Sequence, residues 1–156
     1  MQTRFNPQGT DLGPKFGKYI VAADKVLGAS TLPAATRELV KIRASQINGC
    51  GGCLDMHTKE AALAGETPVR LHLVAAWRET TVFTDAERAA LELTEQGTRL
   101  ADTAGVTDEA WANAAKHYDE EQLMALVAQI AVINTFNRLM VITQQKGGEY
   151  QPGQLG

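Results

Sequence analysis

Two cysteines three residues apart carry the clearest chemical signal in the sequence. Cys50 and Cys53 enclose two glycines and follow Gly49, where one helical pattern ends and another begins. A thiol at the N-terminus of a helix lies in the partial positive charge of unpaired backbone N–H groups, which favours its thiolate. In a reducing compartment such a pair is more often catalytic or metal-binding than structural. The motif therefore predicts thiol chemistry.

Two other residues are placed to assist that chemistry. His57 follows Cys53 by four positions, so a helix puts its imidazole on the same face as the second sulfur. It can serve there as a base or a counter-ion near neutral pH. Glu38 lies twelve residues before Cys50, and its helical face leads through positions 42 and 45 to the dithiol turn. A carboxylate at that place can orient His57, which gives a nucleophile, a base and an orienting group.

The spacing also leaves other interpretations open. The pair could be half of a zinc site, but zinc takes about four ligands, and only Cys50, Cys53 and His57 cluster locally. It could be a structural disulfide or two inert buried thiols, and Glu38 could be a surface acid paired with Lys41 or Arg37. We assign no chemistry to the remaining histidines and the tryptophans, which we expect to be structural and core residues respectively: His72, His117, Trp77 and Trp111.

Helical signals recur along the chain, and no stretch shows the apolar–polar alternation of a half-buried strand. We expect helices over 32–48 (closed by Gly49), from about 54, from 67 to at least 77, from 84, over a short stretch from 107, and over Leu123–Ile142. Thr84 and Glu87 have capping-box spacing, and Val106 is placed to pack against Trp111.

The last of these helices is unusually apolar. Every residue from Leu123 to Ile133 is apolar except Gln129. Such a helix must be covered on all sides, either at the centre of the domain or between the core and a subunit interface. Asn134, Asn137 and Arg138 follow, and these side chains need partners if they are buried.

Composition sets the class of protein. The 156 residues are 44% hydrophobic and 21% charged, with a net charge of −3, which is typical of one globular domain over 1–156. Together with the recurring helical signals, this predicts an all-α domain of about six or seven helices with short connections. The acidic balance argues against nucleic acid and anionic membranes as partners. Without a signal-peptide core or a long apolar run, we expect a cytoplasmic protein. The polar residues 1–15 and the Gly-rich tail 147–156 should be loose or wrapped on a neighbour.

The segment from Glu38 to His57, ELVKIRASQINGCGGCLDMH, resembles the core motif of the AhpD-like alkylhydroperoxidases in the carboxymuconolactone decarboxylase superfamily. The segments 75–80, 83–91 and 136–139 are also similar, so the resemblance spans roughly residues 30–145. It implies a compact all-helical fold assembled as a homo-trimer or homo-hexamer. It also implies a thiol-dependent peroxidase that acts on small organic hydroperoxides.

The resemblance assigns a role to each site residue. Cys53 would attack the peroxide, and Cys50 would give a proton and then resolve the sulfenic acid as a disulfide. Glu38 and His57 would form the proton relay, and a dithiol partner, in some members a lipoylated protein, would supply electrons. No cofactor or metal ion is expected. The helix dipole alone favours Cys50 as the more acidic thiol, but the register with His57 and the resemblance favour Cys53, which we take as the nucleophile.

One residue departs from the family pattern. Members can carry a histidine just before the second cysteine, where this chain has Gly52. The relay must then use Glu38, His57 and water alone. Two alternatives to a peroxidase remain: a non-enzymatic helical oligomer with a redox-sensing dithiol, and a carboxymuconolactone-type decarboxylase, whose chemistry does not require a cysteine pair.

Overall fold

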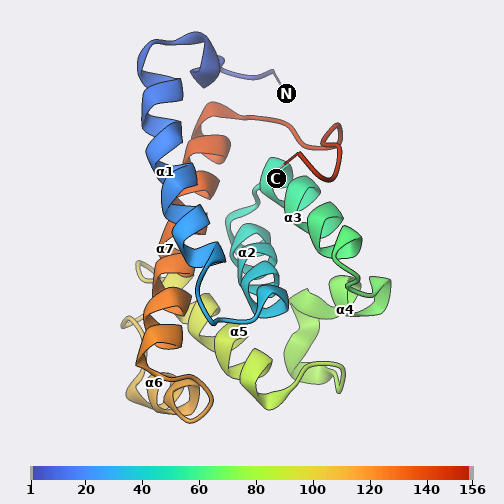
Figure 1. Ribbon diagram of the computed structural model, residues 1–156, viewed down its shortest axis with the longest axis vertical. Coiled ribbons are helices and arrows are strands. Elements are labelled where there is room, and N and C mark those ends of the chain that lie inside the picture. Colours follow the sequence, from blue (N-terminus) through green and yellow to red (C-terminus); the bar gives the residue numbers. More distant parts are fainter. Residues whose placement is uncertain (1, 155–156) are drawn as a thin grey trace.

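A computed structural model describes residues 2–154 and confirms the all-α expectation, because this part of the chain contains helices and no strand (Figure 1). The elements in chain order are η1 (Pro7–Gly9), α1 (Leu12–Gly28), α2 (Ala34–Asn48), α3 (Gly51–Leu63), α4 (Pro68–Leu73), η2 (Val74–Glu79), α5 (Asp85–Thr98), α6 (Asp108–Ala115) and α7 (Glu120–Thr143), where η denotes a 3₁₀ helix.

Helix α2 is the centre of the domain. It packs against α7, α5 and α3, and Figure 1 shows it surrounded by other helices. Val40, Ile42 and Ala44 have no exposed surface and belong to three separate apolar clusters. Successive helical residues point about 100° apart, so a helix that is buried at neighbouring positions must be covered on several sides. This burial fixes α2, and with it Glu38 and the turn that carries the cysteines.

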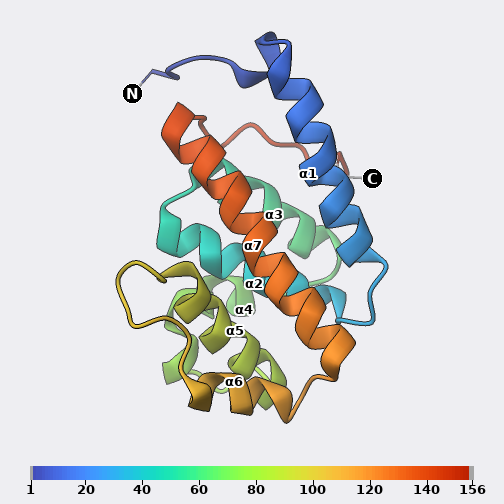
Figure 2. The same ribbon diagram turned by 90° about the vertical axis from the view of Figure 1, so that its left-hand side faces the viewer.

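Helix α7 lies between α2 and α1, and Figure 2 shows it crossing the molecule beside α1. By length and composition it could cross a membrane, with a mean hydropathy of 1.6 in its most apolar window. However, Gln129 and Asn137 are 1% and 0% exposed and hydrogen-bond to α1 and α2 respectively. Since buried amides need partners within the fold, these bonds attach the inner face of α7 to the bundle.

Several helix ends lie where the sequence predicts them. Gly49 ends α2 in the left-handed conformation, at φ 66°, which glycine adopts without steric cost. Thr84 and Glu87 form both hydrogen bonds of the capping box at the start of α5. Thr107 caps α6. Asp119 caps α7, so that helix begins at Glu120, ahead of the expected Leu123. The helix expected from 67 to at least 77 is instead divided into α4 and η2, with a non-helical backbone at Ala76.

Four expectations need correction or refinement. Trp77 is a core residue, but Trp111 is 45% exposed because α6 turns it toward a surface groove beside Val127. His72 and His117, which we expected to be structural residues, have exposed side chains. The N-terminal segment, which we expected to be loose or wrapped on a neighbour over residues 1–15, is helical from Leu12 onward.

The C-terminal tail is fastened to its own chain. Residues 147–154 return to α3, where the carboxylate of Asp55 accepts hydrogen bonds from the backbone of Gly148 at 2.6 Å and of Tyr150 at 3.0 Å. The two last residues of the expected loose tail, 155–156, lie outside the described part of the chain.

Candidate functional site

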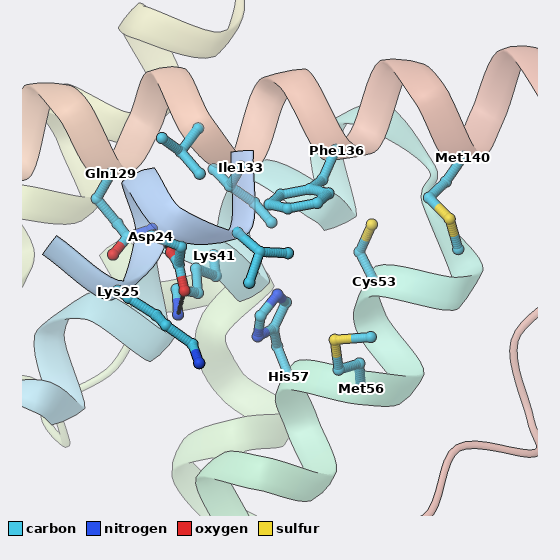
Figure 3. Close-up of a pocket in the computed structure, with 12 residues that line it drawn as sticks. Asp24, Lys25, Lys41, Cys53, Met56, His57, Gln129, Ile133, Phe136 and Met140 are labelled. Carbon is cyan, nitrogen blue, oxygen red and sulfur yellow. Dashed lines mark hydrogen bonds and ion pairs between the residues drawn. The ribbon is translucent and has the colours of Figure 1, made fainter. Parts of the chain in front are cut away.

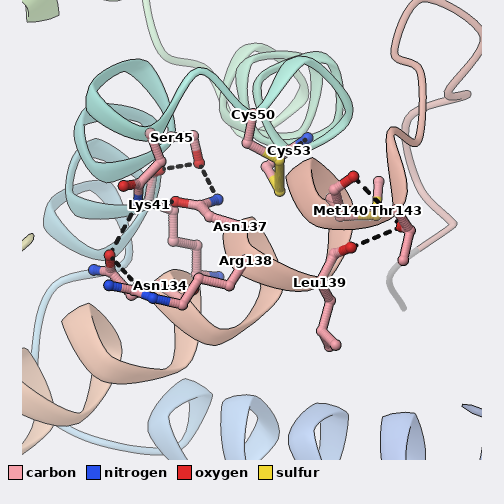
Figure 4. Close-up of a disulfide and its surroundings, with 11 residues drawn as sticks. Lys41, Ser45, Cys50, Cys53, Asn134, Asn137, Arg138, Leu139, Met140 and Thr143 are labelled. Atoms are coloured by element: carbon pink, nitrogen blue, oxygen red, sulfur yellow. Dashed lines mark hydrogen bonds between the residues drawn. A yellow bond between two sulfur atoms is a disulfide. The ribbon is translucent and has the colours of Figure 1, made fainter. Parts of the chain in front are cut away.

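The dithiol lies at the junction of two helices. Cys50 is the N-cap residue of α3, and its backbone N–H donates to the carbonyl of Ser45 at 2.9 Å. Its sulfur accepts a hydrogen bond from the backbone N–H of Cys53. The two cysteines are joined by a disulfide, with their Cα atoms 5.4 Å apart (Figure 4). The turn therefore holds both sulfurs close enough to bond within one turn of helix, as a reversible dithiol requires.

Polar side chains attach this turn to α7. The amide of Asn48 donates to the side-chain oxygens of Asn134 and Asn137, each at 2.9 Å. Asn137 in turn donates to the hydroxyl of Ser45 at 3.0 Å, as Figure 4 shows. The two asparagines that the sequence required to have partners thus hold the C-terminal end of α2 directly before the dithiol.

Glu38 and His57 meet as the sequence predicts. His57 Nδ1 lies 3.1 Å from Glu38 Oε2, and the two side chains are 9% and 22% exposed. Burial alone would raise the pKa of Glu38, but the hydrogen bond from His57 and the charge of Lys41 outweigh it, and the pKa lies below its ordinary value. An ionised Glu38 accepts the Nδ1 proton of His57, which leaves Nε2 as the free ring nitrogen.

The alternative interpretation, in which Glu38 is a surface acid paired with Lys41 or Arg37, holds for the partner but not for the exposure. Lys41 Nζ does donate to Glu38 Oε1, at 3.0 Å. Both side chains lie largely inside the protein, at 10% and 22% exposure. The pair therefore belongs to the site rather than to a solvated helix face.

A cavity of about 200 Å³ joins Cys53 and His57 to a largely apolar wall (Figure 3). The apolar lining comes mainly from α3 and α7 and includes Met56, Val132, Ile133, Phe136 and Met140. An apolar cavity of roughly 150 Å³ is enough to hold benzene, so this one accommodates a compact organic molecule. Cys53 lines the cavity, whereas Cys50 does not and is 1% exposed. The geometry thus offers one sulfur to a bound molecule and keeps the other behind it.

Three residues that sequence reasoning did not assign to the site stand at one end of the same cavity: Asp24, Lys41 and Gln129. Asp24 Oδ2 lies 3.5 Å from Lys41 Nζ, and its Oδ1 accepts from the Gln129 amide at 2.9 Å. The sequence offered one signal for this group, because Gln129 is the single polar residue of an apolar run. Asp24 gave none, because no helix was assigned to its segment.

The structure also accounts for Gly52. A Cβ atom at this position would lie 2.5 Å from Met140 Cε and 3.5 Å from the carbonyl oxygen of Lys146. A side chain at position 52 would therefore require the flexible end of Met140 to shift, whereas the backbone at Lys146 is at ordinary contact distance. Among residues 2–154, no group of three or more His, Cys, Asp or Glu side chains is arranged to hold a metal ion, so the geometry gives no support to the zinc interpretation.

Known proteins match the chain along most of its length. A protein of unknown function from Agrobacterium tumefaciens, provisionally designated the antioxidant defence protein AhpD, has a similar structure, with a TM-score of 0.87 and 32% identity over 96% of this chain and all of that one. YdfG of Bacillus subtilis, an uncharacterised protein, is 41% identical over 84% of this chain and 88% of its own length. YnjA of Escherichia coli, also uncharacterised, is 34% identical over 74% of this chain and 64% of its own length. The model of the carboxymuconolactone decarboxylase family matches residues 14–96. The chain belongs to the carboxymuconolactone decarboxylase family and has the AhpD-like fold.

Proposed function

We propose that the protein is a thiol-dependent peroxidase that reduces small organic hydroperoxides. The observation that carries this proposal is the shared cavity: Cys53 and His57 face the same apolar space, and His57 is bonded to Glu38. A nucleophile, a base and an orienting carboxylate are the parts that an activated thiol needs. The AhpD designation of the Agrobacterium protein supports the same assignment.

In the first step, the reduced enzyme attacks the peroxide. The thiolate of Cys53 attacks the terminal oxygen of ROOH, the O–O bond breaks, and the sulfur is oxidised to a sulfenic acid. The leaving alkoxide takes a proton that His57 accepted from the thiol, so the first product is the alcohol ROH. The apolar wall of the cavity holds the organic group R.

In the second step, Cys50 attacks the sulfenic sulfur of Cys53 and water leaves, which forms the disulfide seen in the structure. A dithiol donor, for which the resemblance suggests a lipoylated protein, then reduces this disulfide by exchange. The balance is ROOH plus a dithiol giving ROH, water and the donor's disulfide. Because the cycle depends on repeated reduction, we infer a cytoplasmic setting.

Consumption of cumene hydroperoxide and tert-butyl hydroperoxide by the pre-reduced protein tests the proposal. We expect two thiols to be lost for each peroxide consumed, and continued turnover when dihydrolipoamide is supplied. A variant with both cysteines changed to serine is the control and should consume none. One round of thiol oxidation without turnover would favour the redox sensor, and loss of a muconolactone substrate without any peroxide consumption would favour the decarboxylase.

A further inference from the structure

A buried ammonium group stands at the end of the cavity away from the disulfide. The Lys41 side chain is 10% exposed and contacts two carboxylates, Glu38 Oε1 at 3.0 Å and Asp24 Oδ2 at 3.5 Å. Burying a charge is unfavourable unless it is paired and hydrogen-bonded. None of the chemical steps above uses this lysine, so its place beside the cavity requires a separate explanation.

We propose that Lys41 is a positioning residue that keeps Glu38 ionised and thereby holds His57 with its Nε2 atom free to accept the proton of Cys53. This inference rests on the proposed function, in which His57 is the base. The bonds on the two oxygens of one carboxylate carry it: Oε1 accepts from Lys41, and Oε2 accepts from His57 Nδ1.

The protonation state of Glu38 determines which ring nitrogen of His57 is free. A carboxylate accepts the Nδ1 proton and leaves Nε2 with a lone pair. A carboxylic acid would instead donate to Nδ1, and the ring proton would move to Nε2, which could then no longer act as a base. Burial favours the acid form of Glu38, and the hydrogen bond from His57 together with the charge of Lys41 opposes it. Without Lys41, fewer interactions would oppose the effect of burial, and the acid form of Glu38 would become more favourable.

The other charged groups around the cavity make this balance specific. Helix α1 contributes Asp24 and Lys25, α3 contributes His57, and α7 contributes the neutral Gln129. Gln129 is 1% exposed and holds the carboxylate of Asp24 next to Lys41. Without Lys41, the carboxylates of Asp24 and Glu38 would lose the cation between them, which further favours protonation of Glu38. Asp24 therefore shares Lys41 with Glu38, at 3.5 Å against 3.0 Å, and the lysine keeps Glu38 charged.

Two readouts that need no peroxide test the role of Lys41. In the reduced Cys50→Ser protein, ¹⁵N NMR reports the tautomer of His57, and iodoacetamide reports the reactivity of Cys53 between about pH 5 and 9. Lys41→Met should move the ring proton to Nε2 and displace the alkylation profile to higher pH by about one unit, a roughly tenfold slower reaction on its acid limb. Lys41→Arg should restore the parent tautomer and profile. Lys18→Met, at an exposed position of α1, is the matched control and should match the parent.

The outcomes separate this inference from the proposed function. A parent-like His57 tautomer and alkylation profile in folded Lys41→Met would overturn the role of Lys41. Equal displacement of the profile in Lys41→Met and Lys41→Arg would also overturn it, because the charge would then not matter. Asp24→Asn provides a test that does not depend on how Lys41→Met folds. It leaves Lys41 to Glu38 alone, so the profile should move to lower pH, and a move to higher pH would contradict the inference. Absence of peroxidase activity in the unaltered protein would refute the function without touching these measurements.

Discussion

His57 Nδ1 and Glu38 Oε2 lie 3.1 Å apart although nineteen positions separate them in the chain. The bond joins α3 to α2 on either side of the turn that carries the cysteines. Because the chain runs directly from α2 to α3 through Gly49 and Cys50, the hydrogen bond closes a loop around the dithiol. The bond therefore positions the imidazole relative to the sulfurs, as the proposed proton transfer requires.

Removing either member of this pair should slow peroxide reduction strongly. General acid–base assistance is worth about 10²–10⁴ in rate, so Glu38→Gln and His57→Asn should each lower kcat/KM for cumene hydroperoxide within that range. The double variant should lose little more than either single one, because members of a catalytic unit are not additive. Glu109→Gln, at an exposed position of α6, is the control. Multiplicative losses in the double variant would show that the two residues act independently. An unchanged kcat/KM in Glu38→Gln would show that Glu38 takes no part in the reaction.

The two cysteines should behave differently when each is changed to serine. Cys53 lines the cavity and Cys50 does not, so Cys53→Ser should abolish peroxide consumption. Cys50→Ser should still react once and leave a sulfenic acid on Cys53 that dimedone traps, because no second thiol remains to resolve it. Mass spectrometry of the adducts measures this. A dimedone adduct on Cys50 in the Cys53→Ser protein, with none on Cys53 in the reverse variant, would exchange the two roles.

Local sequence rules predicted the parts of the site that are close in the chain. Glycine at 49 ends α2 because it adopts positive φ without strain, and helical periodicity puts Cys53 and His57 on one face. These rules could not place Asp24 against Lys41, since that contact depends on how α1 packs on the bundle. The prediction that Trp111 is a core residue was wrong for a related reason. An apolar side chain on a short amphipathic helix can face a groove as well as the core, and only packing decides between them.

Gly52 and Met140 should be coupled in stability. A Cβ at position 52 would lie 2.5 Å from Met140 Cε. Gly52→His, which introduces the histidine that the resemblance suggests here, should therefore lower the free energy of unfolding by about 1–3 kcal/mol through overpacking. Met140→Ala in the same protein should recover part of that loss, which urea denaturation of the single and double variants would measure as a coupling energy.

Gly51→His is the matched control for this pair, because a Cβ at position 51 has no neighbour closer than 4.0 Å. It should show no coupling to Met140→Ala. Additive effects of Gly52→His and Met140→Ala would mean that the methionine is not what excludes a side chain next to the second cysteine.

The tail should be released from α3 by acid. Hydrogen bonds from Lys59 and from the backbone of Tyr150 and Gly148 lower the pKa of Asp55 from 3.8 to about 2. A carboxyl whose pKa is lower in the folded state stabilises that state fully above its ordinary pKa, and the contribution disappears as the pH falls through the lowered value. Asp55→Asn should therefore speed amide hydrogen exchange at Gly148 and Tyr150 near neutral pH. The difference from the unaltered protein should shrink as the pH falls toward about 2 and vanish below it.

Asp102→Asn, at an exposed position before α6, controls for the lost negative charge and should exchange like the parent throughout. Faster exchange in Asp55→Asn that persists unchanged at the acid end would show that the effect comes from altered packing rather than from the ionised carboxylate.

The outer face of α7 should be a contact between copies of the chain. Met124 is 64%, Val127 41% and Ile142 63% exposed, and apolar side chains exposed along one helix are candidates for burial in a protein contact. We expect light scattering to give a homo-oligomer, with the trimer and the hexamer as the sizes that the resemblance favours. Val127→Glu should dissociate it, because an unpaired charge buried in a contact costs about 3–5 kcal/mol, more than a hundredfold in Kd. Val69→Glu, on the exposed surface of α4, should leave the assembly intact. A mass of one 16.8 kDa chain for the unaltered protein at micromolar concentration, or equal dissociation by both glutamates, would reject this face as the contact.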